Sequence, residues 1–161
     1  PTNGLEWQYH QHDCSVTQTG TIMCFDNGNH RATPFEPKMA EADCYSRAVE
    51  FAVDSHARTV SQIWARGRQG DGTYSTYQSG AVRLPETGNT FINYGGVRTL
   101  DGVPSGQINT GHCHTRLIEV TSGSPGETVF EMIVNDCTST APTPLSSFRA
   151  EHYPNFGIGG S

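Results

Sequence analysis

Two His-x-His pairs are the residues whose type and spacing most directly suggest chemistry. They stand at residues 10–12 (HQH) and 112–114 (HCH). Because residues two apart on a strand share a face, each pair could offer two imidazole nitrogens to copper or zinc. Such short pairs are weak motifs, and no carboxylate stands at a matching spacing. A metal site built from His10, His12, His112 and His114 is therefore kept as an alternative.

Individual residues near the N-terminal end allow a structural and a functional interpretation. Arg31 follows the turn-forming run 26–29 (DNGN), so it either pins this loop through a salt bridge or belongs to a site, and the site role is favoured. His12 is either a strand histidine bonded to a neighbouring sheet or a site residue. Asp13 either caps a turn or orients His12. Together these residues form the first candidate site.

The five cysteines form an odd set without a Cys-x-x-Cys pair, which disfavours a zinc ribbon. Cys14 and Cys24 flank an expected hairpin turn. A disulfide in an oxidising compartment and two buried free thiols are equally open there. One cysteine must stay unpaired or pair outside this chain. The set is Cys14, Cys24, Cys44, Cys113 and Cys137.

Composition excludes several classes of protein. The net charge is −6, and the ten Lys and Arg residues are scattered, so binding to a nucleic-acid backbone is not expected. No apolar run approaches the roughly 18–20 residues that span a bilayer, so no membrane span is expected. The chain opens at Pro1 without a methionine or a signal peptide. We expect a mature product or a piece of a longer chain, with repeat counting favouring the piece.

An internal repeat organises the chain. Three anchors hold nearly one offset, with a single insertion between the first and the others, which indicates a duplication. Residues 18–28 match 86–96 at an offset of 68 (86 − 18), while 47–51 match 116–120 and 59–60 match 128–129 at 69.

Each copy of the repeat predicts four strands. The alternation of large and small side chains over residues 45–53 is the strand period of two, and Gly20 supplies the turn of a hairpin. No sustained helical period is present, and residues 37–43 form at most one helical turn. The expected strands are 13–18, 21–25, 45–53 and 59–65 in the first copy, and 81–85, 90–94, 115–121 and 128–134 in the second.

Tandem four-stranded units are typical of β-propeller blades, of which about 4–8 close a ring. Two blades alone would expose packing faces and strand edges. We therefore expect an all-β partial propeller over residues 1–153, completed by blades from a longer precursor or from other chains. The repeat copies span about 13–67 and 81–136, with a flanking strand at about 145–153 and a Gly-rich tail at 154–161. A compact two-sheet β-sandwich is the alternative.

Three motifs carry a family resemblance over most of the chain. They are residues 10–31 (HQHDCSVTQTGTIMCFDNGNHR), 45–51 (YSRAVEF) and 89–96 (NTFINYGG). In this order and spacing they resemble the C-terminal part of the bacterial aryl-sulfate sulfotransferases. That resemblance implies a six-bladed propeller of the periplasm or cell exterior. It also implies transfer of a sulfuryl group from an aryl sulfate to a phenol through a sulfated histidine, without a nucleotide donor, metal or other cofactor.

The resemblance assigns roles to individual residues. It makes His12 the acid that donates a proton to the departing phenolate, and Arg31 the cation that neutralises the sulfate. At residues 146–150 (SSFRA), Ser147 stands in the place of the family's nucleophilic histidine, and a serine lacks the imidazole that would be sulfated. Asp13, Asn27 and Arg149 are the supporting candidates.

Catalysis does not follow from this resemblance, because the expected nucleophile is replaced. Small aryl sulfates and phenols are the expected partners of an enzyme of this kind. The alternative is a non-catalytic propeller module that scaffolds an assembly or binds anions, and the second alternative is the metal site of the His-x-His pairs.

Overall fold

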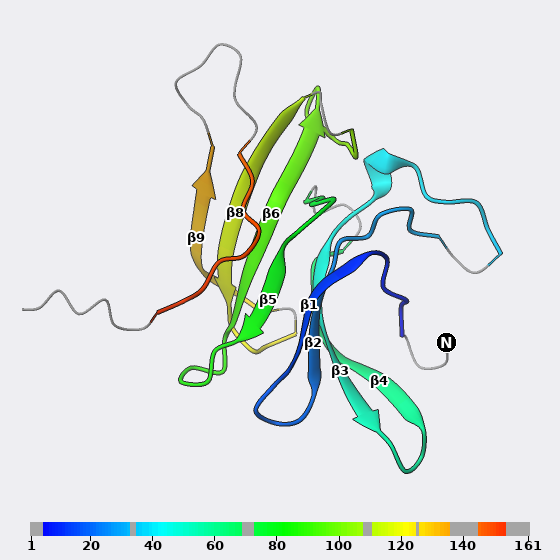
Figure 1. The fold of residues 1–161 in the computed structure, drawn as a ribbon, viewed down its shortest axis with the longest axis vertical. Helices are drawn as coiled ribbons and strands as arrows, with labels where there is room; N and C mark the ends of the chain where they lie inside the picture. Colours follow the sequence, from blue (N-terminus) through cyan, green and yellow to red (C-terminus); the bar gives the residue numbers. More distant parts are fainter. Residues whose placement is uncertain are drawn as a thin grey trace, which may run out of the picture.

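The fold consists of two antiparallel sheets that follow one another along the chain (Figure 1). The computed structural model describes residues 5–32, 35–68, 73–107, 111–124, 126–135 and 145–153. The Gly-rich tail expected at 154–161 lies outside these residues, as does Cys137. No helix in the described part of the chain is long and apolar enough to cross a membrane.

The first sheet is a meander in the order β1-β2-β3-β4. A tight turn joins β1 to β2, with Gly20 at a φ of +82° and its backbone N–H donating to the carbonyl of Thr17 at 3.0 Å. The expected helical turn before β3 is a 3-10 turn at Glu41–Asp43. The strands are β1 (Gln11–Val16), β2 (Ile22–Asp26), β3 (Arg47–Asp54) and β4 (Thr59–Arg66).

The second sheet repeats the meander as β5-β6-β8-β9, with the short β7 paired to the end of β6. β6 extends six residues beyond the expected Tyr94, because a bulge between Tyr94 and Val97 carries the strand through Gly95 and Gly96. The strands are β5 (Gly80–Arg83), β6 (Thr90–Leu100), β7 (Val103–Pro104), β8 (His112–Val120) and β9 (Thr128–Val134). The all-β class is thus confirmed, with two successive antiparallel sheets, of which the second has a fifth strand, β7, that was not expected.

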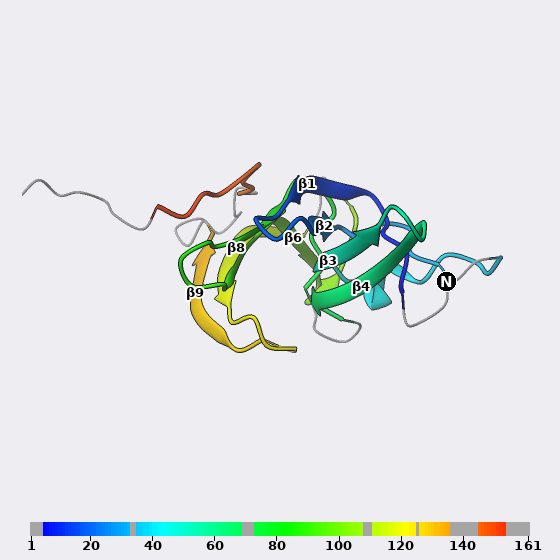
Figure 2. The same ribbon diagram turned by 90° about the horizontal axis from the view of Figure 1, so that it is seen from below.

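The main core lies between the two sheets. Phe25 of β2 meets Tyr94 of β6 edge to face, with ring centroids 5.3 Å apart. Apolar side chains from both sheets join this pair, so burying them fixes one sheet against the other. β1 and β2 contact β5, whereas the outer strands β4 and β9 diverge (Figure 2). The core residues are Met23, Phe25, Ala48, Trp64, Ala81, Ile92, Tyr94, Val97, Ile118 and Val120.

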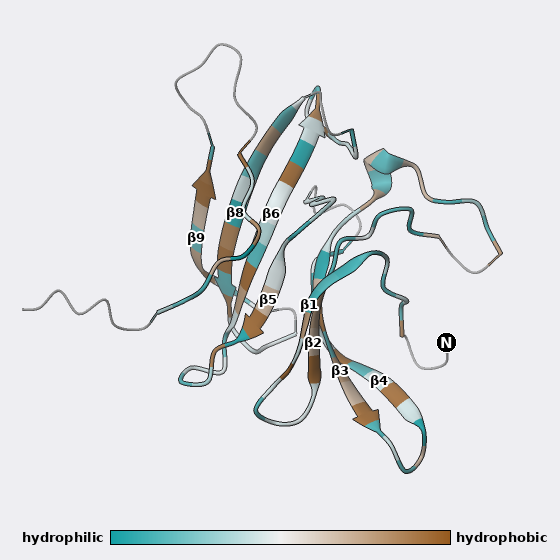
Figure 3. Ribbon diagram, in the orientation of Figure 1, coloured by the Kyte–Doolittle hydropathy of each residue, from teal (hydrophilic) through white to brown (hydrophobic). Residues whose placement is uncertain are grey.

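Hydrophobic residues also occur along the strands of both sheets (Figure 3), and some of them lie outside the main core. On the first sheet, Cys24, Val49 and Phe51 form a second cluster, and the neighbouring Val53 and Val60 are each 49 % exposed. On the second sheet, Leu84, Phe91 and Leu117 form a third cluster. The register of β8 with β9 places three exposed residues on the face of Leu117: Phe130, Met132 and Val134.

A disulfide joins Cys14 of β1 to Cys24 of β2, with Cα atoms 4.2 Å apart. The disulfide interpretation of this pair is therefore confirmed. Cys44 and Cys113 are free thiols, both buried.

Removing the disulfide should destabilise the protein. The bond closes a loop across ten residues of sequence separation, and the double variant Cys14→Ser/Cys24→Ser is expected to lose about 2–3 kcal/mol of unfolding free energy. Urea unfolding measures this loss, and a reductant should destabilise the wild type while leaving the variant unchanged. A variant as stable as the wild type would show that the bond constrains nothing.

Candidate functional site

A small pocket forms where β1, the loop before β5 and the segment 145–153 meet. Its volume is about 50 Å³. It brings Arg149 next to the adjacent pair His12 and Asp13, although more than 130 residues separate Arg149 from that pair in the sequence. The residues that line it are His12, Asp13, Gln78, Ser79, Phe148 and Arg149.

Unusual backbone conformations cluster at this pocket. Asp13 has a φ of +52° within a bulge that shifts the register of β1 between His12 and Ser15. Gln78 and Ser79, on the facing loop, have φ values of +57° and +83°. Residues other than glycine rarely adopt a positive φ, and those that do are concentrated at functional sites. A bulge also redirects neighbouring side chains, so it helps to aim His12.

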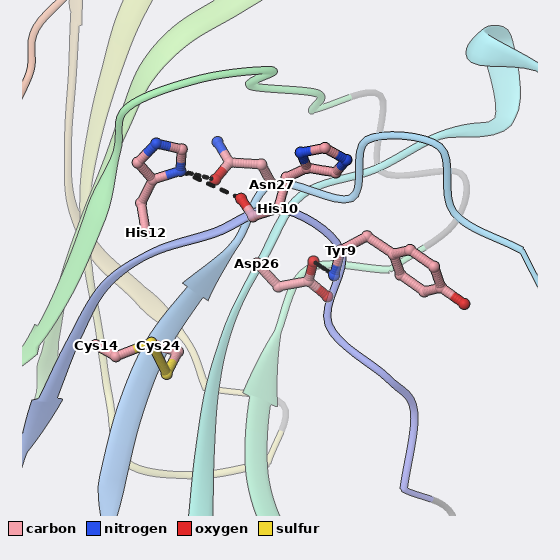
Figure 4. The surroundings of a disulfide bond; sticks show 7 residues. All are labelled: Tyr9, His10, His12, Cys14, Cys24, Asp26 and Asn27. Carbon is pink, nitrogen blue, oxygen red and sulfur yellow. Dashed lines mark hydrogen bonds between the residues drawn. A yellow bond between two sulfur atoms is a disulfide. The ribbon is translucent and has the colours of Figure 1, made fainter.

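The imidazole of His12 is held through Nδ1 (Figure 4). Nδ1 lies 2.6 Å from Oδ1 of Asn27 and 3.2 Å from the carbonyl of His10. The amide of Asn27 is oriented by its Nδ2, which donates to the carbonyls of Ser75 at 2.7 Å and Gln78 at 3.1 Å. Both partners of Nδ1 are therefore acceptors. We accordingly assign the ring proton to Nδ1, which leaves Nε2 as the atom that can exchange a proton with a ligand.

Replacing Asn27 with alanine should weaken the preference of the His12 ring for the Nδ1–H tautomer. Nitrogen NMR of the neutral imidazole is expected to show Nδ1 protonated in the wild type and a shift toward Nε2–H in Asn27→Ala. Activity should fall on the order of 10²-fold, because a misplaced proton-transfer group is costly. The matched control is Asn29→Ala, since the Asn29 side chain donates to the carbonyl of Thr76 at 2.5 Å on the same loop. An unchanged His12 spectrum in Asn27→Ala would contradict the assignment.

Arg149 brings a positive charge to the pocket from the far end of the chain. One of its terminal nitrogens (Nη2) lies 2.5 Å from Oδ1 of Asp13. Its side chain is 54 % exposed, so the pair is open to solvent and to a ligand. Gly80 makes room for Asp13, because a Cβ at this position would lie 2.3 Å from Oδ2 of the carboxylate.

A larger cavity of about 390 Å³ shares Asp13 and Arg149 with the small pocket. It follows β5 and is lined on one side by the apolar Leu84 and Phe91. His12 therefore lies beside a space that can receive an aromatic group, with charged residues at the junction.

Ser147 lies next to this region but is not among the described residues that line the small pocket. Its backbone N–H donates to the carbonyl of Gly95 at 2.8 Å. Its hydroxyl donates to Oδ1 of Asn93 at 2.7 Å and lies 3.3 Å from Oγ1 of Thr115. Since the hydroxyl proton goes to an amide oxygen, the described contacts of Ser147 include no base that would activate it.

Arg31 is buried within the first sheet. Its guanidinium forms ion pairs with Asp26 and Glu6 and donates to the carbonyl of Tyr45 at 3.2 Å. It also lies 4.1 Å from the centroid of the Tyr45 ring. Burial, followed by the hydrogen bond to Glu6, raises the pKa of the Tyr45 hydroxyl to about 12, so this hydroxyl stays protonated. Among the described residues, those lining the His12 pocket do not include Arg31.

The His-x-His pairs remain on different sheets. His10 lies against the ring of His30, with centroids 5.6 Å apart, while His112 and His114 belong to β8. Burial, with the nearby charges of Arg116 and His112, lowers the pKa of His114. In the ranges that the structure describes, no three His, Cys, Asp or Glu side chains group so as to hold a metal.

Three pocket residues were not expected from the sequence: Gln78, Ser79 and Phe148. Phe148 adjoins the Ser147 motif, so its neighbourhood was a usable signal. Gln78 and Ser79 lie in a connection between the two repeat copies. Nothing in their residue types predicts a positive φ.

Comparison with known proteins agrees with these motifs. A family model described as arylsulfotransferase (ASST) matches residues 1–142. The arylsulfate sulfotransferases AssT of Escherichia coli O6:H1 (strain CFT073) and of Lelliottia amnigena are each 28 % identical to this chain over 139 residues. These alignments cover 81 % of this chain and 23 % of each relative, so the match spans about a quarter of their length. The chain belongs to the arylsulfotransferase family.

Proposed function

We propose that this chain contributes to a sulfuryl transferase that moves the SO₃ group of an aryl sulfate to a phenolic acceptor. The observation that carries the proposal is the hydrogen bond between Nδ1 of His12 and Oδ1 of Asn27, in a pocket that Arg149 also lines. Family membership supports sulfuryl transfer in general. The cavity along β5 adds space for an aryl group beside the pocket.

His12 acts in this proposal through Nε2. As a neutral ring it accepts the proton of the incoming phenol, whose oxygen forms a new S–O bond to the sulfuryl group while the S–O bond of the donor breaks. The resulting imidazolium then donates this proton to the phenolate that leaves the donor. Asn27 fixes the ring in the orientation that both steps require.

Two arginines are candidates for neutralising the sulfate. The resemblance favours Arg31, whereas the geometry favours Arg149, which lines the pocket. Arg149→Gln should raise KM for the donor with little effect on stability, because its pair with Asp13 is exposed. Arg31→Gln should chiefly lower stability. A rise in KM for Arg31→Gln alone would restore the assignment to Arg31.

The two sheets are, in this proposal, neighbouring blades of a six-bladed propeller. The apolar outward faces of both sheets support this arrangement, since each would be covered by a further sheet. The relatives are long enough to contain such further sheets, because the alignment with this chain covers only 23 % of their length. The segment 145–153 forms no ladder within the described residues, and we propose that it is the inner strand of the next blade. The Cys14–Cys24 disulfide supports a periplasmic or secreted location.

The test is a transfer assay with the full-length or assembled protein. 4-Nitrophenyl sulfate as donor and phenol as acceptor should yield nitrophenolate and phenyl sulfate, without an added nucleotide. Release of nitrophenolate that depends on phenol supports transfer. A folded protein that binds the donor but does not turn it over would contradict the proposed transfer activity.

Ser147 favours one alternative, a binding module that holds anionic aryl esters without reacting. Its hydroxyl lacks a base among the described residues, and the resemblance places it where a nucleophilic histidine is expected. Ser147→His distinguishes the two functions. A gain of turnover in this variant of an otherwise inactive protein would show a binding module derived from an enzyme.

A further inference from the structure

Besides the His12 pocket and the cavity along β5, a cleft of about 400 Å³ lies between the end of β4 and the strands β6 and β8. It shares no described lining residue with the His12 pocket or with the cavity along β5. Three arginines line it, and none of its described lining residues is acidic. The lining residues are Ala65, Arg66, Gly67, Arg68, Thr73, Tyr94 and Arg116.

Two of these arginines reach the cleft from opposite sheets and are held in place. Arg66 of β4 donates to the carbonyl of Gly126 at 2.7 Å and to Oγ1 of Thr128 at 3.0 Å. Arg116 of β8 donates to Oγ1 of Thr73 at 2.9 Å and lies 5.7 Å from the centroid of the Tyr94 ring. Because these contacts already fix both guanidiniums, binding a ligand costs little further side-chain entropy.

The charge of the two arginines is only partly compensated. Arg116 pairs through Nε with Glu131, at 2.7 Å, in an exposed ion pair. Arg66 has no ion pair with a carboxylate in the described part of the chain; the hydrogen bonds recorded for it are to a carbonyl and a hydroxyl. The cleft therefore concentrates positive charge in a chain whose net charge is −6.

The shape of the guanidinium decides the class of ligand. Its planar fork matches two oxygens of a sulfate or phosphate group. Two forks approaching from different sheets suit a tetrahedral oxyanion between them. A volume near 400 Å³ leaves room for an organic group that bears the oxyanion. The hydroxyl of Thr73 offers one more polar contact at the wall.

The geometry assigns to this cleft a second anion site, in which Arg66 and Arg116 together bind the tetrahedral oxyanion of a sulfate or phosphate ester. The site is independent of the proposed transfer reaction, because it uses none of the residues of the His12 pocket. Its occupancy would also link the two sheets, since one arginine comes from each.

The experiment is a titration of the full protein with sodium sulfate and, separately, sodium phosphate, at constant ionic strength set with chloride. The arginine Nε–H signals in a ¹⁵N correlation spectrum report occupancy. Saturable shifts of the Arg66 and Arg116 signals are expected, and Arg66→Gln and Arg116→Gln should each weaken binding by about tenfold or more. The matched control is Arg58→Gln, which removes the same charge from the exposed turn between β3 and β4.

Further variants test whether the guanidinium fork itself is needed and whether this site is separate from the His12 pocket. Arg116→Lys retains the charge but not the fork, so an intermediate affinity is expected. If Arg66→Gln does not fold, Arg116→Gln and Arg116→Lys alone decide. His12→Gln should leave the titration unchanged, which separates this site from the proposed transfer site. Absence of saturation, or equal affinity in Arg116→Gln and Arg58→Gln, would overturn the assignment, and a preference for sulfate or phosphate identifies the oxyanion.

Discussion

Replacing His12 with glutamine should lower the rate of sulfuryl transfer roughly 10²–10⁴-fold, the range that a positioned proton-transfer group contributes. Glutamine fills a similar volume but cannot pass a proton between the donor and acceptor oxygens. The effect should appear in kcat more than in KM, because the proton moves as the S–O bonds break and form. The measurement is nitrophenolate release from 4-nitrophenyl sulfate by the full-length or assembled protein.

His56→Gln is the matched control for this prediction. His56 lies in the exposed turn between β3 and β4, where its backbone N–H donates to Asp54. The substitution should leave both kcat and stability unchanged. If His12→Gln retained the rate of this control, the pocket would have no catalytic role, and the anion-binding alternative would be preferred.

Replacing Asp26 with asparagine should cost about 3–5 kcal/mol of unfolding free energy, the typical cost of breaking a buried ion pair. The Asp26 carboxylate is fully buried and accepts hydrogen bonds from Arg31 at 2.9 Å and Arg47 at 2.8 Å. It also accepts the backbone N–H groups of Tyr9 and Gly28. Without its charge, Glu6, which is 40 % exposed, would be the one carboxylate among the described residues that still pairs with both buried guanidiniums.

Glu131→Gln is the control for Asp26→Asn. It also removes one carboxylate from an arginine pair, but at the surface, where the expected cost is about 0–1 kcal/mol. Urea unfolding of both variants gives the comparison. Equal stabilities would contradict the prediction, because the Asp26 charge would then contribute no more than a surface carboxylate. Since a domain is stable by only about 5–15 kcal/mol, Asp26→Asn should also accumulate poorly in cells.

Most strands were predictable from the sequence because they follow from local patterns. The alternation at residues 45–53 and the repeat offset predicted eight of the strands, with ends shifted by a few residues, but not the short β7. The length of β6 was not predictable in the same way. Gly95 and Gly96 resemble a strand end, yet β6 continues across a bulge and pairs with β8 again from Val97. The glycine at 95 is needed because a Cβ there would lie 2.1 Å from the carbonyl oxygen of Ser147.

The candidate site was predictable only in part. The motif order singled out His12, Asp13 and Arg149, which the structure places around one pocket. It did not predict that Arg31 would be enclosed by Asp26, Glu6 and Tyr45, because those contacts depend on how the strands fold around the buried carboxylate. Nor could it identify the loop carbonyls that orient Asn27, since a carbonyl has no signature in a sequence.

The pairing of Arg149 with Asp13 has a consequence for biosynthesis. The two residues are separated by 136 positions, so a ribosome completes both meanders before it releases the residue that closes the pocket. Contacts between residues so distant in sequence carry a large loop-closure cost, so they depend on the intervening structure having formed. A nascent chain that ended before residue 145 would carry the oriented His12 without its arginine. The pocket can therefore be completed only after residue 149 has left the ribosome.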